Sequence, residues 1–151
     1  MVKNVDMKSK SEVAVKLFKQ GYNCAHSGRG AFHSEIGMSF EDAIKLASSF
    51  GGGMGRMREV CGAVSAMFMV AGIRHGYIAP NDDIVKEKHY TLIQNLADKF
   101  KNDYGTIICR ELLETDDNSP KPSVRTAQYY AERPCENFIA TAAKIISENL
   151  L

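Results

Sequence analysis

The chain has 151 residues, of which 44% are hydrophobic and 25% are charged, and its formal net charge is +1. These values predict one globular domain over residues 1–151, long enough to bury a core of its own. Because the charge is close to zero and basic residues are dispersed beside acidic ones, nothing favours nucleic-acid binding.

The N-terminus and the most apolar stretch both argue against secretion and membrane insertion. Residues 1–20 are rich in lysine and lack the apolar segment of a secretory signal. Residues 60–73 are the most apolar stretch, but a bilayer-spanning helix needs roughly 20 such residues. We therefore expect no membrane span and a cytoplasmic location, where four cysteines indicate catalysis or metal binding rather than permanent disulfides.

The spacing of apolar residues predicts an all-α fold, a single-domain bundle of about six or seven helices. The expected helices are residues 11–20, 24–36, 40–50, 60–75, a segment that starts at 80–82 and is ended by Gly105, 107–113 and 135–150. Segment 60–75 is apolar almost all round and is expected at the centre of the bundle. Residues 114–134 are polar and hold three of the four prolines, which predicts a long loop or lid. The N-terminal helix could cap the bundle or pair with a second copy in a homodimer.

Four cysteines, Cys24, Cys61, Cys109 and Cys135, are the candidate catalytic residues. Their wide separation excludes a CxxC dithiol and the paired spacing of a zinc knuckle, so any shared site must combine four segments. Three of them, all except Cys109, lie near predicted helix starts, where the helix dipole lowers a thiol pKa. The alternative is that each is an inert, buried small hydrophobe. His26, close to Cys24, is best explained by helix capping or a surface position.

A glycine run precedes Cys61, in the sequence FGGGMGRMREVCGA at residues 50–63. Glycine weakens a helix, so the backbone there must bend sharply or approach something closely. One interpretation is a backbone nest for an anion or cofactor; the other is a tightly packed turn between helices. Dinucleotide and Walker motifs do not fit, because no strand precedes the run and no Gly-Lys-Ser/Thr follows it. The candidate cofactor-binding residues are Gly51, Gly52, Gly53, Gly55 and Arg56.

Taken together, these motifs resemble a known family. GYNCA at residues 21–25, FGGGMGR at 50–56, VCGAVS at 60–65, CREL at 109–112 and the late Cys135 are similar in order and spacing to the C_GCAxxG_C_C family of redox-active proteins. The resemblance extends over nearly the whole chain and implies that Cys24, Cys61, Cys109 and Cys135 are the four defining cysteines. The chain departs from the pattern at Ala66, where the motif ends in glycine, and in the HSGRG sequence at residues 26–30.

The resemblance implies cysteine-based redox chemistry, which could take either of two forms. In one, the Cys61 thiolate exchanges with a partner cysteine to form a reversible disulfide, and the sequence does not choose among the three complete pairings. In the other, Cys24, Cys61, Cys109 and Cys135 are metal ligands that converge on an iron–sulfur cluster or zinc. Either form implies an electron-transfer or thiol partner.

Haem is not expected, because no CxxCH motif is present, although a similar domain accompanies the haem domain of split-Soret cytochromes. An alternative of a different class is a non-enzymatic module that binds a small anionic ligand between the glycine run and the 114–134 loop. The cysteines would then be structural.

Overall fold

Helices dominate the computed structural model, which describes the backbone of residues 2–151 and side chains from residue 10 onward. The elements are α1 (Val2–Lys19), α2 (Cys24–Ala31), α3 (Phe40–Ala47), the 3₁₀ turn η1 (Ser48–Phe50), α4 (Gly62–His75), α5 (Asp83–Tyr104), α6 (Cys109–Leu113), α7 (Ala127–Glu132) and α8 (Cys135–Asn149). Six of these eight α-helices have at least seven residues, and no strand occurs between residues 2 and 151. The all-α prediction is therefore confirmed.

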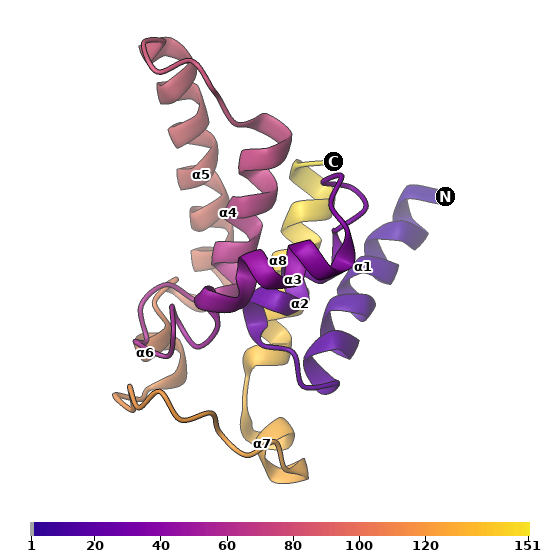
Figure 1. Ribbon diagram of the computed structural model, residues 1–151, viewed down its shortest axis with the longest axis vertical. Coiled ribbons are helices and arrows are strands. Elements are labelled where there is room, and N and C mark those ends of the chain that lie inside the picture. The colour runs from indigo at the N-terminus through magenta and orange to yellow at the C-terminus, as the bar shows by residue number, and fades with distance from the viewer. Residues whose placement is uncertain (1) are drawn as a thin grey trace.

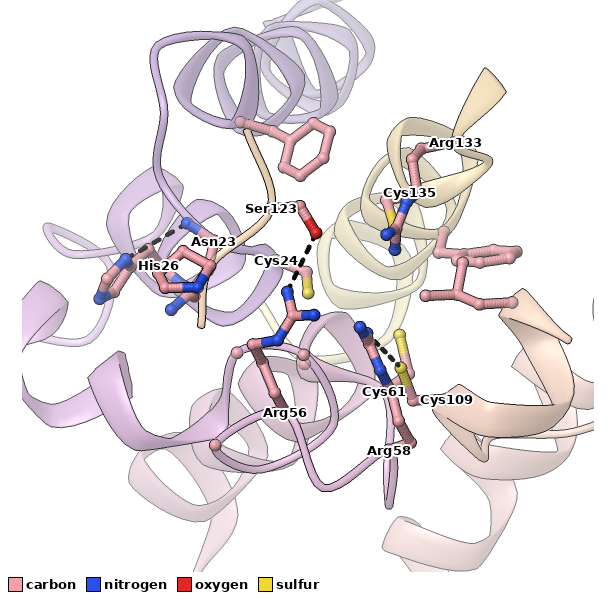
Figure 2. A pocket seen from close by; sticks show the side chains of 18 of the residues that line it. Asn23, Cys24, His26, Arg56, Arg58, Cys61, Cys109, Ser123, Arg133 and Cys135 are labelled. Carbon is pink, nitrogen blue, oxygen red and sulfur yellow. Dashed lines mark hydrogen bonds between the residues drawn. The ribbon is translucent and has the colours of Figure 1, made fainter. Parts of the chain in front are cut away.

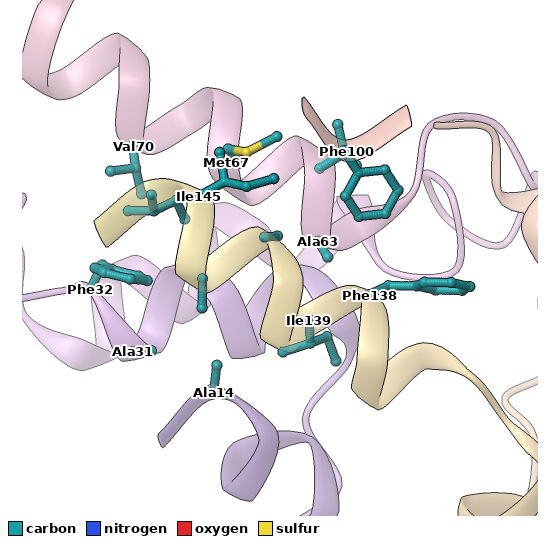
Figure 3. Packing of buried hydrophobic residues seen from close by; sticks show 14 of the residues in the cluster. Ala14, Ala31, Phe32, Ala63, Met67, Val70, Phe100, Phe138, Ile139 and Ile145 are labelled. Atoms are coloured by element: carbon teal, nitrogen blue, oxygen red, sulfur yellow. The ribbon is translucent and has the colours of Figure 1, made fainter. Parts of the chain in front are cut away.

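The bundle is built around α4 and α8, with α1 and α2 packed against them. In Figure 1, the α4–α5 hairpin extends from one end, and α6, α7 and the loop that joins them lie at the other. Apolar side chains from α1, α2, α4, α5 and α8 meet in the core, which Figure 3 shows around Met67 and Ile139. Residues 62–67 of α4 are all buried, and only its last turn is exposed.

The unusual HSGRG sequence of α2 allows close helix packing. A Cβ at Gly28 would lie 2.7 Å from the Cβ of Ala66 on α4, which no real pair of side chains tolerates. A Cβ at Gly30 would lie 3.0 Å from the ring of Phe40. The two glycines therefore let α2 lie directly against α4 and α3, and Ala66 is about the largest residue that this contact admits.

Several predicted boundaries differ from the structure. α1 begins at Val2 rather than residue 11, so it is longer than the amphipathic segment alone indicated. α2 ends at Ala31 rather than residue 36, because residues 32–37 form turns. α4 begins at Gly62 rather than residue 60, because Val60 forms a backbone bridge with Ile108.

The prediction that residues 114–134 form only a loop was wrong for its last part. α7 begins after Thr126, whose hydroxyl accepts a hydrogen bond from the Tyr129 N–H (3.1 Å), as an N-cap does. Its Tyr129 and Tyr130 rings pack on Phe18 of α1. Within residues 2–151, no helix is both long and apolar enough to cross a membrane.

A four-cysteine cavity at the helix N-termini

All four cysteines stand at the N-terminal ends of helices. Cys24, Cys109 and Cys135 are the first residues of α2, α6 and α8, and Cys61 is the N-cap residue of α4. The sequence predicted a position at a helix start for three of them, and the structure shows the same position for Cys109. Because all four line one cavity of about 580 Å³, the N-termini of four helices converge on it (Figure 2).

The glycine run brings the cysteine segments together by close packing. A Cβ at Gly53 would lie 2.6 Å from the Cβ of Cys109, and a Cβ at Gly62 would lie 2.9 Å from the Cys24 sulfur. A Cβ at Gly51 would overlap the side chain of Asn23, the N-cap residue of α2. Three glycines therefore each make room for a cysteine or its neighbour.

The structure contains contacts that fit each of the two interpretations of the glycine run. Gly52, Gly53 and Gly55 have φ values of +64°, +72° and +59°, a left-handed backbone that glycine adopts most easily. Gly51, Gly52, Gly55 and Arg56 line the cavity, so they are placed to meet a ligand. Gly53 does not line it and lies beneath Cys109 instead.

Cys61 and Cys109 are joined by a short antiparallel backbone pairing. The Cys61 N–H donates to the carbonyl of Ile107 (2.8 Å), and the Cys109 N–H donates to the carbonyl of Glu59 (2.6 Å). Val60 and Ile108 form the bridge between these bonds. The pairing holds the backbone of Cys61 close to that of Cys109, and both side chains line the cavity (Figure 2).

Asn23 and His26 fix the start of α2. The Asn23 side chain accepts a hydrogen bond from the His26 N–H (2.8 Å), and the Asn23 N–H donates to His26 Nδ1 (3.3 Å). This reciprocal pair is a capping box. The prediction of a capping role for His26 is therefore confirmed, and the pair orients the turn that carries Cys24.

The predicted lowering of thiol pKa values was wrong for two cysteines. Burial, followed by the nearby charge of Cys24, raises the pKa of Cys61 well above its usual value, although the N–H groups of Val64 and Ala63 oppose the change. The same two causes raise the pKa of Cys135 to about 12. Burial also raises the pKa of Cys109. The loss of hydration thus outweighs the helix dipole, which contributes typically less than about 1 kcal/mol.

The cavity is electropositive. Four arginines line it, Arg56, Arg58, Arg125 and Arg133, and no described lining residue is an aspartate or glutamate. Arg58 is 3% exposed, and its Nη1 donates to the Cys109 sulfur at 3.7 Å. The charge of a nearby guanidinium favours a thiolate over a thiol. The arginines that line the cavity therefore favour negative charge at the centre of the cavity.

Two arginines hold the 114–126 loop over the cavity. Arg56 donates to the carbonyl of Ser119 (2.7 Å) and to the hydroxyl of Ser123 (3.1 Å), and Arg58 donates to the carbonyl of Asp117 (2.8 Å). Pro120, Pro122 and Ser123 of this loop line the cavity. This arrangement agrees with the lid expected from the sequence.

Arg125 and Arg133 flank α7 and were not among the predicted site residues. Arg125 donates to the carbonyls of Phe18 (3.1 Å) and Tyr22 (3.3 Å), which ties the loop to the end of α1. The Arg133 guanidinium lies 4.9 Å from the centre of the Tyr129 ring. Their only sequence signal was their position beside a Thr cap and a proline.

The four thiols surround the cavity without closing on a single point. Among residues 10–151, whose side chains are described, no three Cys, His, Asp or Glu side chains lie close enough together to hold one metal ion. A zinc ion requires sulfur atoms at about 2.3 Å from the metal. The spacing of the thiols in this structure is therefore wider than a single-ion site. All four are free thiols here.

Fold and site define a helical protein in which four free thiols surround one arginine-lined cavity. The chain belongs to the C_GCAxxG_C_C family, because a family model described as "Putative redox-active protein (C_GCAxxG_C_C)" matches residues 22–149. This range includes all four cysteines and confirms the resemblance found in the sequence. No curated protein and no solved structure matches the chain.

Proposed function

We propose that Cys24, Cys61, Cys109 and Cys135 hold an iron–sulfur cluster, which would make the protein a carrier of single electrons. One observation carries this proposal: four thiols from four separate segments line one cavity that has four arginines and no carboxylate. Soft thiolate ligands select iron–sulfur clusters or zinc, and a cluster needs more room than one ion. The cavity volume of about 580 Å³ provides room for a cluster.

The charges around the thiols support the same proposal. A ligand set of four thiolates is strongly anionic, and three of these thiols stay protonated in the metal-free protein because burial raises their pKa values. Metal cations replace the protons when such a site is loaded, so metal binding itself stabilises the thiolates. The cavity arginines and the helix N-termini would stabilise the remaining negative charge.

A second candidate is a reversible disulfide between Cys24 and Cys61. The Cys24 sulfur lies against Gly62, the residue that follows Cys61, and Cys24 is the most exposed of the four cysteines. In this reaction the two thiols lose two protons and two electrons and form an S–S bond, while a partner disulfide is reduced to two thiols. The raised pKa of Cys61 disfavours it as the attacking thiolate.

Analysis of protein purified without oxygen tests the proposal. We expect bound iron and acid-labile sulfide, with the cysteines unreactive toward a thiol reagent until the iron is removed. Four reactive thiols without iron would exclude the cluster. Two reactive thiols without iron would instead support the disulfide.

Matched variants locate the ligands. Each of Cys24→Ser, Cys61→Ser, Cys109→Ser and Cys135→Ser should lower the iron content. Ser123→Ala provides the control, because Ser123 lines the same cavity but carries no thiol.

A further inference from the structure

We infer that the four-cysteine cavity also binds a small organic acid, whose carboxylate pairs with Arg133. This inference rests on the proposed function, because it names the class of substrate that would meet the redox centre. The observations that carry it are the size of the cavity, the free edge of one guanidinium and the apolar wall beside it.

The cavity has the size of a small-molecule pocket. Its volume of about 580 Å³ lies within the range of roughly 300–1,000 Å³ typical of ligand sites. Apolar side chains from α1, α6 and α8 form part of its wall: Phe18, Leu112, Leu113 and Phe138. An apolar wall beside an arginine fits a ligand that has one anionic end and one apolar end.

Arg133 differs from the other three cavity arginines because its hydrogen-bonding groups are unused. Arg56, Arg58 and Arg125 each donate to backbone carbonyls. The Arg133 side chain has neither a hydrogen-bond acceptor nor an acidic partner among the residues whose side chains are described, although it is half-buried. Figure 2 shows its guanidinium directed into the cavity beside Cys135.

The local backbone holds Arg133 in this position. It precedes Pro134 and has the extended conformation that a proline requires of its neighbour, with φ of −80° and ψ of 126°. Its N–H donates to the carbonyl of Tyr129 (3.0 Å), and its guanidinium lies over the ring of the same residue. The ring supports one face of the planar group and leaves its N–H edge available to a carboxylate, which accepts two parallel bonds.

Calorimetric titration of the anaerobically purified protein at fixed ionic strength tests the inference, with benzoate, benzamide and inorganic phosphate as probes. Benzoate should bind more tightly than benzamide, which has the same shape without the charge. It should also bind more tightly than phosphate, which has the charge without an apolar body. Tighter binding of phosphate, equal binding of benzamide, or no benzoate binding would overturn the inference.

Variants assign the binding to Arg133. Arg133→Gln should weaken benzoate binding by about tenfold or more, and Arg133→Lys by less, because lysine keeps the charge but loses the planar fork. Arg74→Gln is the control, since Arg74 is exposed and donates to the carbonyl of Glu35. Unchanged benzoate affinity in folded Arg133→Gln, verified by thermal unfolding, would contradict the assignment.

The iron content of each sample separates this inference from the proposed function. If benzoate binding depends on Arg133 in protein without iron, the result would support the acid site and exclude the cluster. If iron-loaded protein does not bind benzoate, the result would support the cluster and exclude the acid site.

Discussion

Gly53 lies directly beneath Cys109, so close that a Cβ at position 53 would stand 2.6 Å from the Cys109 Cβ. Gly53 also has a φ of +72°, which an L-amino acid adopts only with strain. Gly53→Ala should therefore lower the free energy of unfolding by about 2–4 kcal/mol, from strain and overpacking together. Chemical denaturation measures this change, and the iron content should fall with it if the cluster is present.

Two other glycines separate the causes of that loss. Gly105→Ala introduces similar strain, since φ is +82°, but no atom lies within 4 Å of its added Cβ, so it should destabilise by about 1–2 kcal/mol. Gly72→Ala, within α4 and also in open space, should stabilise by about 0.5–1 kcal/mol. Equal effects at Gly53 and Gly105 would show that contact with Cys109 does not matter.

Arg58 should control the reactivity of Cys109. Its hydrogen bond to the Cys109 sulfur lowers the pKa of that thiol against the larger effect of burial. Arg58→Met should therefore raise the pKa of Cys109 further and slow its alkylation in the metal-free protein at alkaline pH. The rate follows the thiolate fraction, which falls about tenfold for each unit that the pKa rises.

Mass spectrometry of the alkylated peptide measures this rate. Arg110→Met is the matched control, because Arg110 follows Cys109 in the sequence but is exposed and pairs with Glu59. Faster alkylation of Cys109 in Arg58→Met would refute the assigned role.

Arg56 should keep the 114–126 loop closed. Arg56→Lys removes the planar fork that reaches Ser119 and Ser123, so loop opening should become about tenfold more frequent, as expected for the loss of ~1.5 kcal/mol of charge-assisted hydrogen bonding. Hydrogen exchange of residues 115–124 reports this opening, with Arg110→Lys as the control. Exchange that is unchanged in Arg56→Lys would mean that the loop is held by other contacts.

Much of the fold could be predicted from the sequence, but little of the electrostatics of the site could. Helical periodicity predicted the all-α class, and helix starts were correctly expected at Cys24 and Cys135. α7 was missed because it is short and its apolar contact is with Phe18, more than 100 residues earlier. Local patterns cannot reveal such a contact.

The same limit applies to the site. The four cysteines could be identified from their motifs, but their convergence on one cavity depends on tertiary packing at Gly53 and Gly62. The predicted pKa values were wrong because a helix dipole is a local property, whereas the burial of Cys61 and Cys135 is set by the whole fold. Arg133 could not be selected, because its unpaired guanidinium is visible only in three dimensions.

The metal-free protein should become less stable as the pH rises above about 9. Thiols in the unfolded chain lose their protons near pH ~8.5, whereas Cys135 in the folded chain keeps its proton up to a pKa of about 12. Between these values the folded state binds more protons, so its free energy of unfolding falls by up to about 1.4 kcal/mol per pH unit for each such thiol. The stabilisation is present below pH ~8.5 and is lost as the pH approaches 12.

Urea unfolding of chelated, reduced protein at several pH values between 8 and 10.5 measures this slope. Cys135→Ala should show a shallower dependence than the unaltered chain, because one titrating thiol is removed. Parallel pH profiles for the two proteins would show that the Cys135 thiol titrates alike in both states.

Whether the four thiols form one centre can be measured by following each cysteine as the metal-free protein is loaded with iron and sulfide without oxygen. Alkylation followed by mass spectrometry reports Cys24, Cys61, Cys109 and Cys135 separately. We predict that all four become protected together and in proportion to the iron bound. Protection of two cysteines only, or iron uptake that leaves all four reactive, would contradict the account.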